Sequence, residues 1–493
     1  LEYVPERSSR FDWEIDLPYI NGQTTSGWEV GYPATGNRCT SDGVPEVPYP
    51  FTLAEVWQGI VMNMPGYQGE LLRTLPATTR PGDGPTYRWT GGDQIHVSCL
   101  PTTKNGSGEG FLARAPDGTR YWFDWMAQKG REGVKRVEVR GVGQPNVTHH
   151  LVRRNNFLYV SRIEDRFGNY VNFTYSNAWN QPARLTAITA SDGRALTLSY
   201  SNNRVSSISN GTRVWTYGYD TTGQSAQTLT QVLLPDSSAW TIDLKPLHKR
   251  VRYLLAYPAG EVIRTCFDNE VPQNSNEVLI GAVTHPSGAR GTFRVEIREH
   301  GRSSVPISCT GVRSLTPGGG TGGNDPNDDI NLWAISAYSW TLTRKTLDGP
   351  GLPAMTWNYS YTPNVSYYFH PGTSYGWPMC PAGFDCSQPP CTSPSCAQAS
   401  VTHVSGPEGK WVRYHHGNTY RYNEGKLVKV ETGTGSTTLS TTAYTYDLSQ
   451  ANQAYPARYG DTRQFAGESF SDMYHRPLLS EQTTRQGTTF TRT

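Results

Sequence analysis

The chain has 493 residues and a formal net charge of +2 at pH 7, so its charge gives no electrostatic case for a nucleic-acid partner. No stretch approaches the roughly 18 consecutive apolar residues of a membrane-spanning helix, and the sequence therefore predicts no membrane span. Only 36% of the residues are apolar, whereas 50 glycines, 34 prolines and 29 tyrosines are present. This composition is typical of a protein with many short strands and turns.

Residues 1–104 lack the repeated unit that begins further along the chain, and proline and glycine interrupt them, as in the cluster of Pro45, Pro48 and Pro50. Arrays of repeats need atypical ends that cover exposed strand edges and apolar faces. We therefore expect this segment to form a small β-rich cap or plug at one end of the array.

Residues 105–300 form a first block of repeats, in which a polar turn with glycine precedes alternating residues that end on an aromatic. The clearest copies span 165–175, 191–200 and 210–219. Asp-Gly and Asn-Gly supply the positive backbone angles of a tight hairpin turn, and alternating β-branched and aromatic residues suit a strand with one buried face. The predicted turn residues are Asp165, Gly168, Asp192, Gly193, Asn210 and Gly211.

One hairpin cannot bury its apolar face alone, so we expect the copies to stack side by side in a continuous sheet. Residues 301–400 continue the repeats with two insertions, a Gly-rich loop at 317–329 and a Cys-rich loop at 380–396. A second, truncated block of repeats occupies residues 401–493.

The repeated unit resembles the RHS or YD-repeat family, which includes teneurins, the shell-forming components of Tc toxins and bacterial polymorphic toxins. The resemblance rests on a Gly-containing turn followed by Tyr-x-Tyr or Phe-x-Tyr, and it is closest at Tyr420-Arg-Tyr-Asn-Glu-Gly425 and Tyr444-Thr-Tyr-Asp447. It covers residues 105–245 and 400–493. The fold that it implies is all-β, with repeated hairpins that form a spiralling sheet shell behind an N-terminal cap or plug region.

Eight cysteines are present, and four lie in the Cys-rich loop among prolines and serines. Zinc sites more typically show Cys-x2-Cys pairs, so we expect a disulfide-stapled surface loop with three open connectivities. For the other four, order along the chain suggests that the first pairs with the second and the third with the fourth. The disulfide candidates are Cys39, Cys99, Cys266, Cys309, Cys380, Cys386, Cys391 and Cys396. Their number indicates an oxidising compartment.

Two motifs that suggest chemistry have simpler interpretations. Gly372-Thr-Ser374-Tyr-Gly376 matches the G-x-S-x-G nucleophile elbow, but Pro378 and Pro381 forbid the helix that must follow the serine. The stretch 325–329 gathers oxygen donors without the residue order of an EF-hand, which favours a solvated loop.

The paired histidines and the paired acids also have structural interpretations, so neither predicts a metal site or a catalytic site. His149 with His150, and His415 with His416, are adjacent on predicted strands and would point to opposite faces. Asp165 and the preceding Glu164 lie in a repeat turn, where aspartate has a local hydrogen-bonding role. The sequence therefore predicts a protein that is not an enzyme, with no catalytic, cofactor-binding or metal site.

The resemblance implies a secreted or surface-exposed bacterial protein, or its N-terminal portion, whose shell encapsulates and delivers a C-terminal effector in competition between cells. Its expected partners are a C-terminal toxin cargo or a cell-surface partner. The Asp-Pro-containing core motif linked to autoproteolysis in similar proteins is absent after residue 401, so any toxin is expected outside this chain. Because the chain opens at Leu1 without Met and stops at Thr493 within a strand-like stretch, we interpret it as a processed or partial piece.

Two alternatives stay open. An extracellular structural or adhesive protein would self-assemble through exposed sheet edges into a filament or surface layer, as a homo-oligomer. A carbohydrate-binding β-protein would instead use its surface aromatics.

Overall fold

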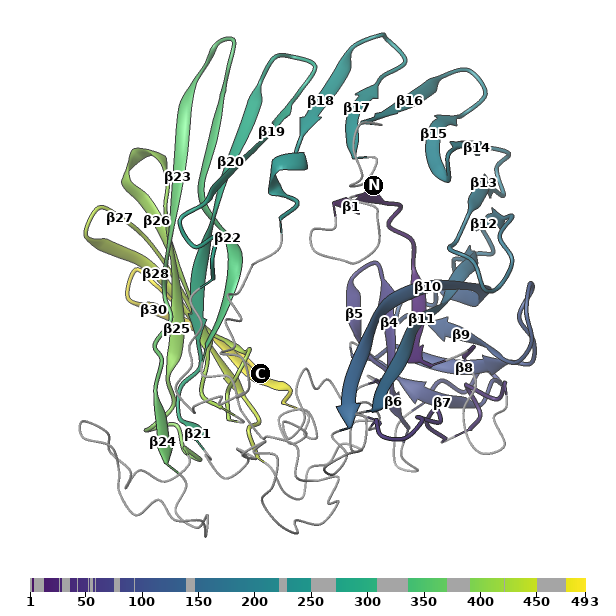
Figure 1. Ribbon diagram of the computed structural model, residues 1–493, viewed down its shortest axis with the longest axis horizontal. Helices are drawn as coiled ribbons and strands as arrows, with labels where there is room; N and C mark the ends of the chain where they lie inside the picture. The colour runs from purple at the N-terminus through teal and green to yellow at the C-terminus, as the bar shows by residue number, and fades with distance from the viewer. Residues whose placement is uncertain are drawn as a thin grey trace. The chain divides into compact units, whose positions relative to one another are not determined.

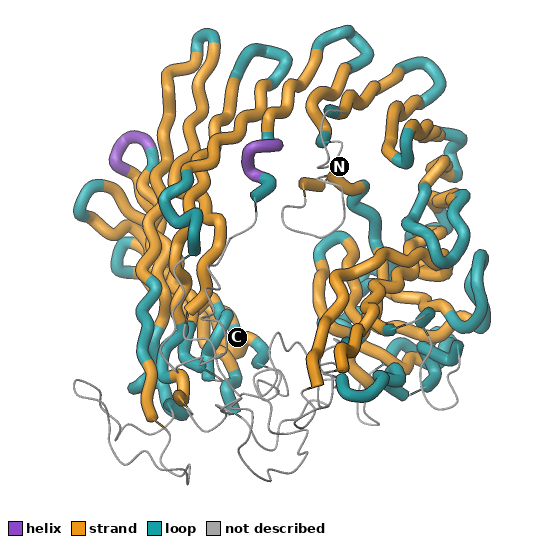
Figure 2. The backbone as a smooth tube through the Cα atoms, in the orientation of Figure 1, coloured by secondary structure: helices purple, strands orange, loops and turns teal. Residues whose placement is uncertain are grey.

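A computed structural model describes most of the chain. The described residues are 2–3, 13–25, 27–28, 36–41, 43–51, 53, 56–57, 59–74, 80–92, 94–138, 147–220, 228–249, 272–307, 336–369, 391–420, 422–449 and 476–493. Within these ranges the chain is all-β, as the sequence predicts, and it contains no α-helix (Figure 2). Short 3-10 helices occur at η2 (Lys245–Leu247) and η4 (Pro407–Gly409).

The chain divides into two compact units, of which the first ends at Trp240 and the second begins at Thr241. Strands in both units pair almost entirely in antiparallel fashion. The four-part division expected at residues 104, 300 and 400 stays a prediction.

The first unit is organised around one long strand pair, β10–β11. Its strands are β1 (Glu2–Tyr3), β2 (Trp13–Glu14), β3 (Tyr19–Thr24), β4 (Ile60–Met64), β5 (Tyr67–Glu70), β6 (Leu72–Arg73), β7 (Tyr87–Thr90), β8 (His96–Leu100), β9 (Gly110–Arg114), β10 (Arg120–Glu138), β11 (Val147–Glu164), β12 (Tyr170–Tyr175), β13 (Leu185–Ala190), β14 (Ala195–Ser201), β15 (Arg204–Ser209), β16 (Val214–Tyr219) and β17 (Leu229–Leu233). Strand β11 also pairs with β3 and β12, and β10 also pairs with β9 (Figure 1). From β12 to β17 each strand pairs with the next one in the sequence.

The N-terminal strands contain the largest buried cluster of the first unit. Its fully buried aromatic side chains are Trp28, Trp57, Trp89, Phe111 and Phe123. The indole N–H of Trp89 donates to the carbonyl of Cys39 at 2.9 Å, and the carboxylate of Glu109 accepts from the backbone N–H groups of Cys39 and Thr40 at 3.0 and 2.8 Å. Apolar burial and buried hydrogen bonds therefore hold the N-terminal segment against β7 and the start of β9.

The second unit is a meander of longer hairpins. Its strands are β18 (Ala239–Asp243), which begins before the boundary, β19 (Val278–Thr284), β20 (Arg290–Gly301), β21 (Val305–Ile307), β22 (Ser336–Gly349), β23 (Leu352–Thr362), β24 (Tyr367–Phe369), β25 (Ala399–Ser405), β26 (Lys410–Gly417), β27 (Leu427–Thr434), β28 (Thr437–Tyr446), β29 (Leu478–Arg485) and β30 (Thr488–Arg492). They pair in chain order except for β21 and β24, which pair with each other in parallel.

Two disulfides lie within the described residues. Cys39 and Cys99 are joined with their Cα atoms 5.5 Å apart, which is the pair suggested by their order along the chain. Cys391 and Cys396 are joined within the Cys-rich loop, with a Cα–Cα distance of 5.6 Å. The remaining candidates, Cys266, Cys309, Cys380 and Cys386, lie outside the described residues. Both disulfides are consistent with an oxidising compartment.

Removing the two disulfides is expected to destabilise the protein unequally. Loop-closure entropy grows with the length of the closed loop, and the sequence separations are 60 residues for Cys39–Cys99 and 5 for Cys391–Cys396. Replacing both cysteines of a pair by serine should cost about 4 kcal/mol for the first pair and about 2 kcal/mol for the second. Urea unfolding of the two double variants measures this, and an equal loss would contradict the loop-closure explanation.

Candidate functional site

The predicted turn residues lie in three hairpin turns, which span residues 165–169, 190–194 and 210–213. The glycines adopt positive φ angles of 86°, 86° and 94° at Gly168, Gly193 and Gly211. No atom lies within 4 Å of the position that a Cβ would take, so the backbone angle rather than close packing explains the glycine. In each turn an earlier side-chain oxygen accepts a backbone N–H, at 2.9, 3.1 and 2.8 Å for Asp165, Asp192 and Asn210.

The adjacent acids Glu164 and Asp165 are both held in the charged form. A hydrogen bond from Arg162 is the main cause that lowers the pKa of Glu164, which also pairs with Arg120. A hydrogen bond from the Asn169 side chain lowers the pKa of Asp165. A general acid would need a raised pKa, so both groups agree with the structural interpretation of this turn.

In five hairpins a tyrosine hydroxyl donates to a main-chain carbonyl of the preceding strand, and we name each such contact a rung. The rungs are Tyr175 to Val160 at 2.7 Å, Tyr200 to Leu185 at 2.7 Å, Tyr219 to Val205 at 2.9 Å, Tyr361 to Leu342 at 2.7 Å and Tyr446 to Leu427 at 2.9 Å. Three rungs belong to the first unit and two to the second. The repeat is therefore defined by a tertiary contact as well as by its turn.

All five rungs occupy the same position relative to the strand register. The acceptor lies two residues before, and the tyrosine three residues after, the last paired position of the hairpin. These last pairs are Arg162–Asn172, Ala187–Thr197, Ser207–Thr216, Arg344–Asn358 and Lys429–Ala443. The tyrosine hydroxyl therefore continues the hydrogen bonding between two strands beyond the point where their backbone pairing stops.

The rungs of the first unit are linked in series. Tyr175 lies opposite Leu185 on the next strand, and Leu185 accepts the hydroxyl of Tyr200. Tyr200 lies opposite Val205, which in turn accepts the hydroxyl of Tyr219. A register shift of the β-bulge type occurs at each of the three tyrosines. Each hairpin thus positions the acceptor for the next hairpin.

Burial favours the neutral, donating form of the rung tyrosines, whereas nearby cations oppose it. The residue just before the acceptor is basic in three rungs, and the charged groups of Arg184, Arg204 and Lys426 lie 4.8, 5.3 and 5.3 Å from the ring centroids of their tyrosines. Burial raises the pKa of Tyr200, Tyr219 and Tyr361 to about 12. These hydroxyls therefore stay protonated at neutral pH and can donate.

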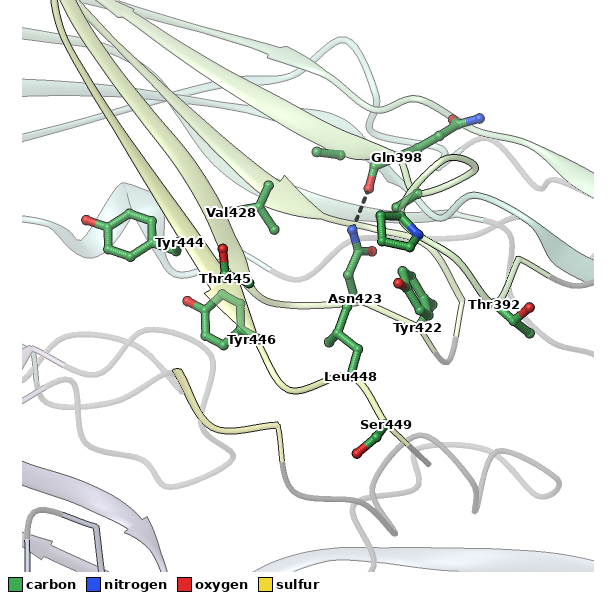
Figure 3. Close-up of a pocket in the computed structure, with 13 residues that line it drawn as sticks. Thr392, Gln398, Tyr422, Asn423, Val428, Tyr444, Thr445, Tyr446, Leu448 and Ser449 are labelled. Carbon is green, nitrogen blue, oxygen red and sulfur yellow. Dashed lines mark hydrogen bonds between the residues drawn. The ribbon is translucent and has the colours of Figure 1, made fainter. Parts of the chain in front are cut away.

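A pocket of about 610 Å³ lies in the second unit, beside the last rung (Figure 3). Strands β27 and β28 form part of its lining, together with the segments 392–399 and 422–423. Its aromatic lining residues are Tyr422, Tyr444 and Tyr446, and its polar ones are Thr392, Gln398, Asn423, Thr445 and Ser449. The segment closest to the YD signature therefore lines a concave site as well as forming a rung.

A buried asparagine ties together the segments behind this pocket. The side-chain N–H₂ of Asn418 donates to three backbone carbonyls, those of Gly301, Pro363 and Asn364, at 3.1, 2.9 and 2.9 Å. Its side-chain oxygen accepts from the Ser303 hydroxyl at 3.0 Å. Because a buried polar group costs free energy when it is left unpaired, this arrangement fixes three distant segments in one geometry.

The same network continues into the pocket wall. The Thr419 hydroxyl accepts from the backbone N–H of Gln398 at 2.7 Å, and the Thr419 N–H donates to the side-chain oxygen of Asn423 at 3.0 Å. The Asn423 side-chain N–H₂ then donates to the Gln398 carbonyl at 3.2 Å (Figure 3). The wall is thus held by hydrogen bonds before any ligand arrives.

The described lining residues of the pocket are all uncharged. They are aromatic, amide, hydroxyl and aliphatic residues.

The other predicted or rejected sites lie elsewhere. His149 and His150 occupy successive positions of β11, opposite Arg136 and Lys135. On β26, His415 contacts Glu431 with its Nε2 2.8 Å from the carboxylate, whereas burial lowers the pKa of its neighbour His416. Ser374 and the stretch 325–329 lie outside the described residues. Over the part of the chain that the structure describes, no three His, Cys, Asp or Glu side chains gather as a metal site.

The sequence missed the acceptors of the rungs and the network around Asn418. The Tyr-x-Tyr endings were visible, but their hydroxyl partners lie 14 to 19 residues away on another strand. A search for an aliphatic residue at that distance before each tyrosine could have found them. Asn418 offers no such signal, because its carbonyl partners lie 54 to 117 residues away.

Neither a scan against protein-family models nor a search of curated proteins finds a match to the chain. In the described ranges, none of the helical segments has the length and apolar character needed to cross a membrane.

Replacing a rung tyrosine by phenylalanine is expected to cost more stability than the same change two residues away. Tyr219→Phe leaves the Val205 carbonyl without its hydroxyl donor, which should lower the free energy of unfolding by about 1 kcal/mol. Tyr217→Phe is the matched control, because Tyr217 lies on the same strand and no described group bonds its hydroxyl. Urea unfolding of both variants measures the difference. An equal loss of unfolding free energy in the two variants would show that the rung does not stabilise the fold.

The rungs also predict loss of stability at alkaline pH. Burial raises the pKa of Tyr200, Tyr219 and Tyr361 to about 12 in the folded state, whereas an unfolded tyrosine ionises near the ordinary pKa of 10.0. Their contribution is therefore fully present below pH 10 and is lost as the pH rises from 10 to 12. Phenolate absorbance and urea unfolding across this range measure the effect, which Tyr219→Phe should reduce. Normal ionisation of all tyrosines near pH 10 in the folded protein would be incompatible with this expectation.

Proposed function

We propose that the chain forms part of the wall of an RHS-type β-shell, in a secreted or surface-exposed bacterial protein that encapsulates and delivers a C-terminal effector. The single observation that supports this best is the recurrence of the rung at one register position in both units. Hairpins that are closed in the same way can be added one after another, which is what a large continuous wall requires.

The proposed wall function is also in keeping with the chemistry of the described sites. The recurring side chains serve turns and rungs, and the lining of the pocket is uncharged. We therefore assign the chain a non-enzymatic role, with catalysis left to the effector.

A second candidate is an extracellular structural or adhesive protein that self-assembles into a filament or surface layer. Strand β30 favours it, because all five of its residues are exposed and its only described partner is β29. The outer edge of such a strand carries N–H and C=O groups that can pair with a strand of another molecule.

Electron microscopy of the full-length gene product tests both candidates. The wall function predicts discrete particles with an internal cavity, in which the effector resists added protease. Tyr200→Phe combined with Tyr219→Phe should weaken that protection, because two rungs in series are lost. Solid or rod-like particles without a cavity would exclude the shell, and filaments with repeating subunit contacts would favour the second candidate.

A further inference from the structure

Asparagine followed by glycine occurs three times in the chain, and the structure places the three pairs in different surroundings. They are Asn21-Gly22, Asn105-Gly106 and Asn210-Gly211. In this dipeptide the backbone nitrogen of the glycine can attack the side-chain amide carbon of the asparagine, because glycine has no Cβ to obstruct the approach. The backbone must be able to turn toward the side chain, so the folded surroundings decide which pair reacts.

The fold holds two of the three pairs in place. Asn21 lies within β3, which is paired with β11 on one side and with β4 on the other. The side-chain oxygen of Asn105 accepts from the backbone N–H of Met126 at 2.7 Å, and its side-chain N–H₂ donates to the carbonyls of Met126 and Asn177 at 2.8 and 3.3 Å. Each of these asparagines must therefore lose hydrogen bonds of the fold before its side chain can meet the next backbone nitrogen.

Asn210 and Gly211 lie in the exposed turn between β15 and β16. Gly211 has a φ of 94°, and no atom lies within 4 Å of the position that a Cβ would take there. Among the described residues, no group bonds the side-chain N–H₂ of Asn210, and the N–H of Gly211 donates to the Ser209 hydroxyl at 3.0 Å within the same turn. The attacking nitrogen and the leaving amide group therefore both lie at the surface.

The same turn polarises the amide that is attacked. The side-chain oxygen of Asn210 accepts from the backbone N–H groups of Thr212 and Arg213 at 3.2 and 2.8 Å, and from the Thr212 hydroxyl at 3.2 Å. Attack on the amide carbon places negative charge on this oxygen, and hydrogen-bond donors that already point at it stabilise that charge. The turn therefore favours the reaction both by its exposure and by its donors.

We propose that Asn210 is a site of spontaneous covalent modification. The Gly211 nitrogen forms a bond with the side-chain amide carbon of Asn210, the bond from that carbon to the side-chain nitrogen breaks, and ammonia leaves with the proton of the Gly211 N–H. Water then opens the resulting succinimide ring at one of its two carbonyls, which gives aspartate or isoaspartate. Both products add one negative charge, and isoaspartate also adds a methylene group to the main chain. The proposal goes beyond the wall function and does not depend on it.

Peptide mass spectrometry of the whole protein, sampled during incubation at mildly alkaline pH, tests the proposal. In the folded protein Asn210 should convert at least about tenfold faster than Asn21 and Asn105, because those two must first open locally. In urea, where the fold no longer protects them, the three rates should become similar. Methylation of the aged Asn210 peptide by an isoaspartyl methyltransferase identifies the isoaspartate product.

Isoelectric focusing of two variants assigns the charge change to its residue. Asn210→Gln should abolish the new acidic species, because a glutamine side chain would have to close a larger ring. Asn180→Gln is the matched control, since Asn180 is also exposed in a turn but precedes Gln181, and it should leave the acidic species unchanged. The proposal is overturned if Asn210 stays unmodified in the folded protein, if Asn21 or Asn105 converts as fast there, or if Asn210→Gln keeps the acidic species.

Discussion

The hydrogen bond from a tyrosine hydroxyl to the carbonyl of the preceding strand is the contact on which the repeated architecture depends. Backbone pairing ends before the strand does, which leaves buried carbonyls in need of a donor. A tyrosine side chain supplies this donor with its hydroxyl and buries its ring between the strands. Phenylalanine would fill the space but leave the carbonyl unpaired, which explains why the five rung positions hold tyrosine.

The turn and the rung together do not fix the length of a hairpin, so the hairpins can differ in length. The Gly-containing turn fixes one end of a hairpin and the rung fixes the other, while donor and acceptor are separated by 14 residues in the Tyr219 rung and by 19 in the Tyr361 rung. The short hairpin β15–β16 and the long hairpin β22–β23 are therefore closed in the same way (Figure 1). The hairpins can therefore differ in length while the same tyrosine contact closes each of them.

Local features of the fold were predictable from the sequence, whereas contacts between distant segments were not. Asp192-Gly193 predicts a turn because the geometry of a turn depends only on residues next to each other in the sequence. The alternation of apolar and polar residues predicts the strands for the same reason. The carbonyl that accepts the Tyr361 hydroxyl, that of Leu342, depends on the length of the hairpin, and no sequence motif predicts that length. The pocket wall depends on Asn418, whose partners come from segments far away in the sequence. Sequence order suggested the Cys39–Cys99 pair but could not give the packing around it.

The first and last strands of the repeated hairpins differ in whether a described strand covers their outer edge. Strand β12 pairs only with residues 162–164 of β11, and the adjoining edge at 154–159 is covered by β3. Strand β3 of the N-terminal region therefore occupies part of the edge of β11, and buried tryptophans pack in the same cluster as Ile20 of β3. At the other end, β30 has no described partner beyond β29. Among the described residues, the strand order therefore runs from β11, whose edge at 154–159 is covered by β3, to β30, whose outer edge has no described partner.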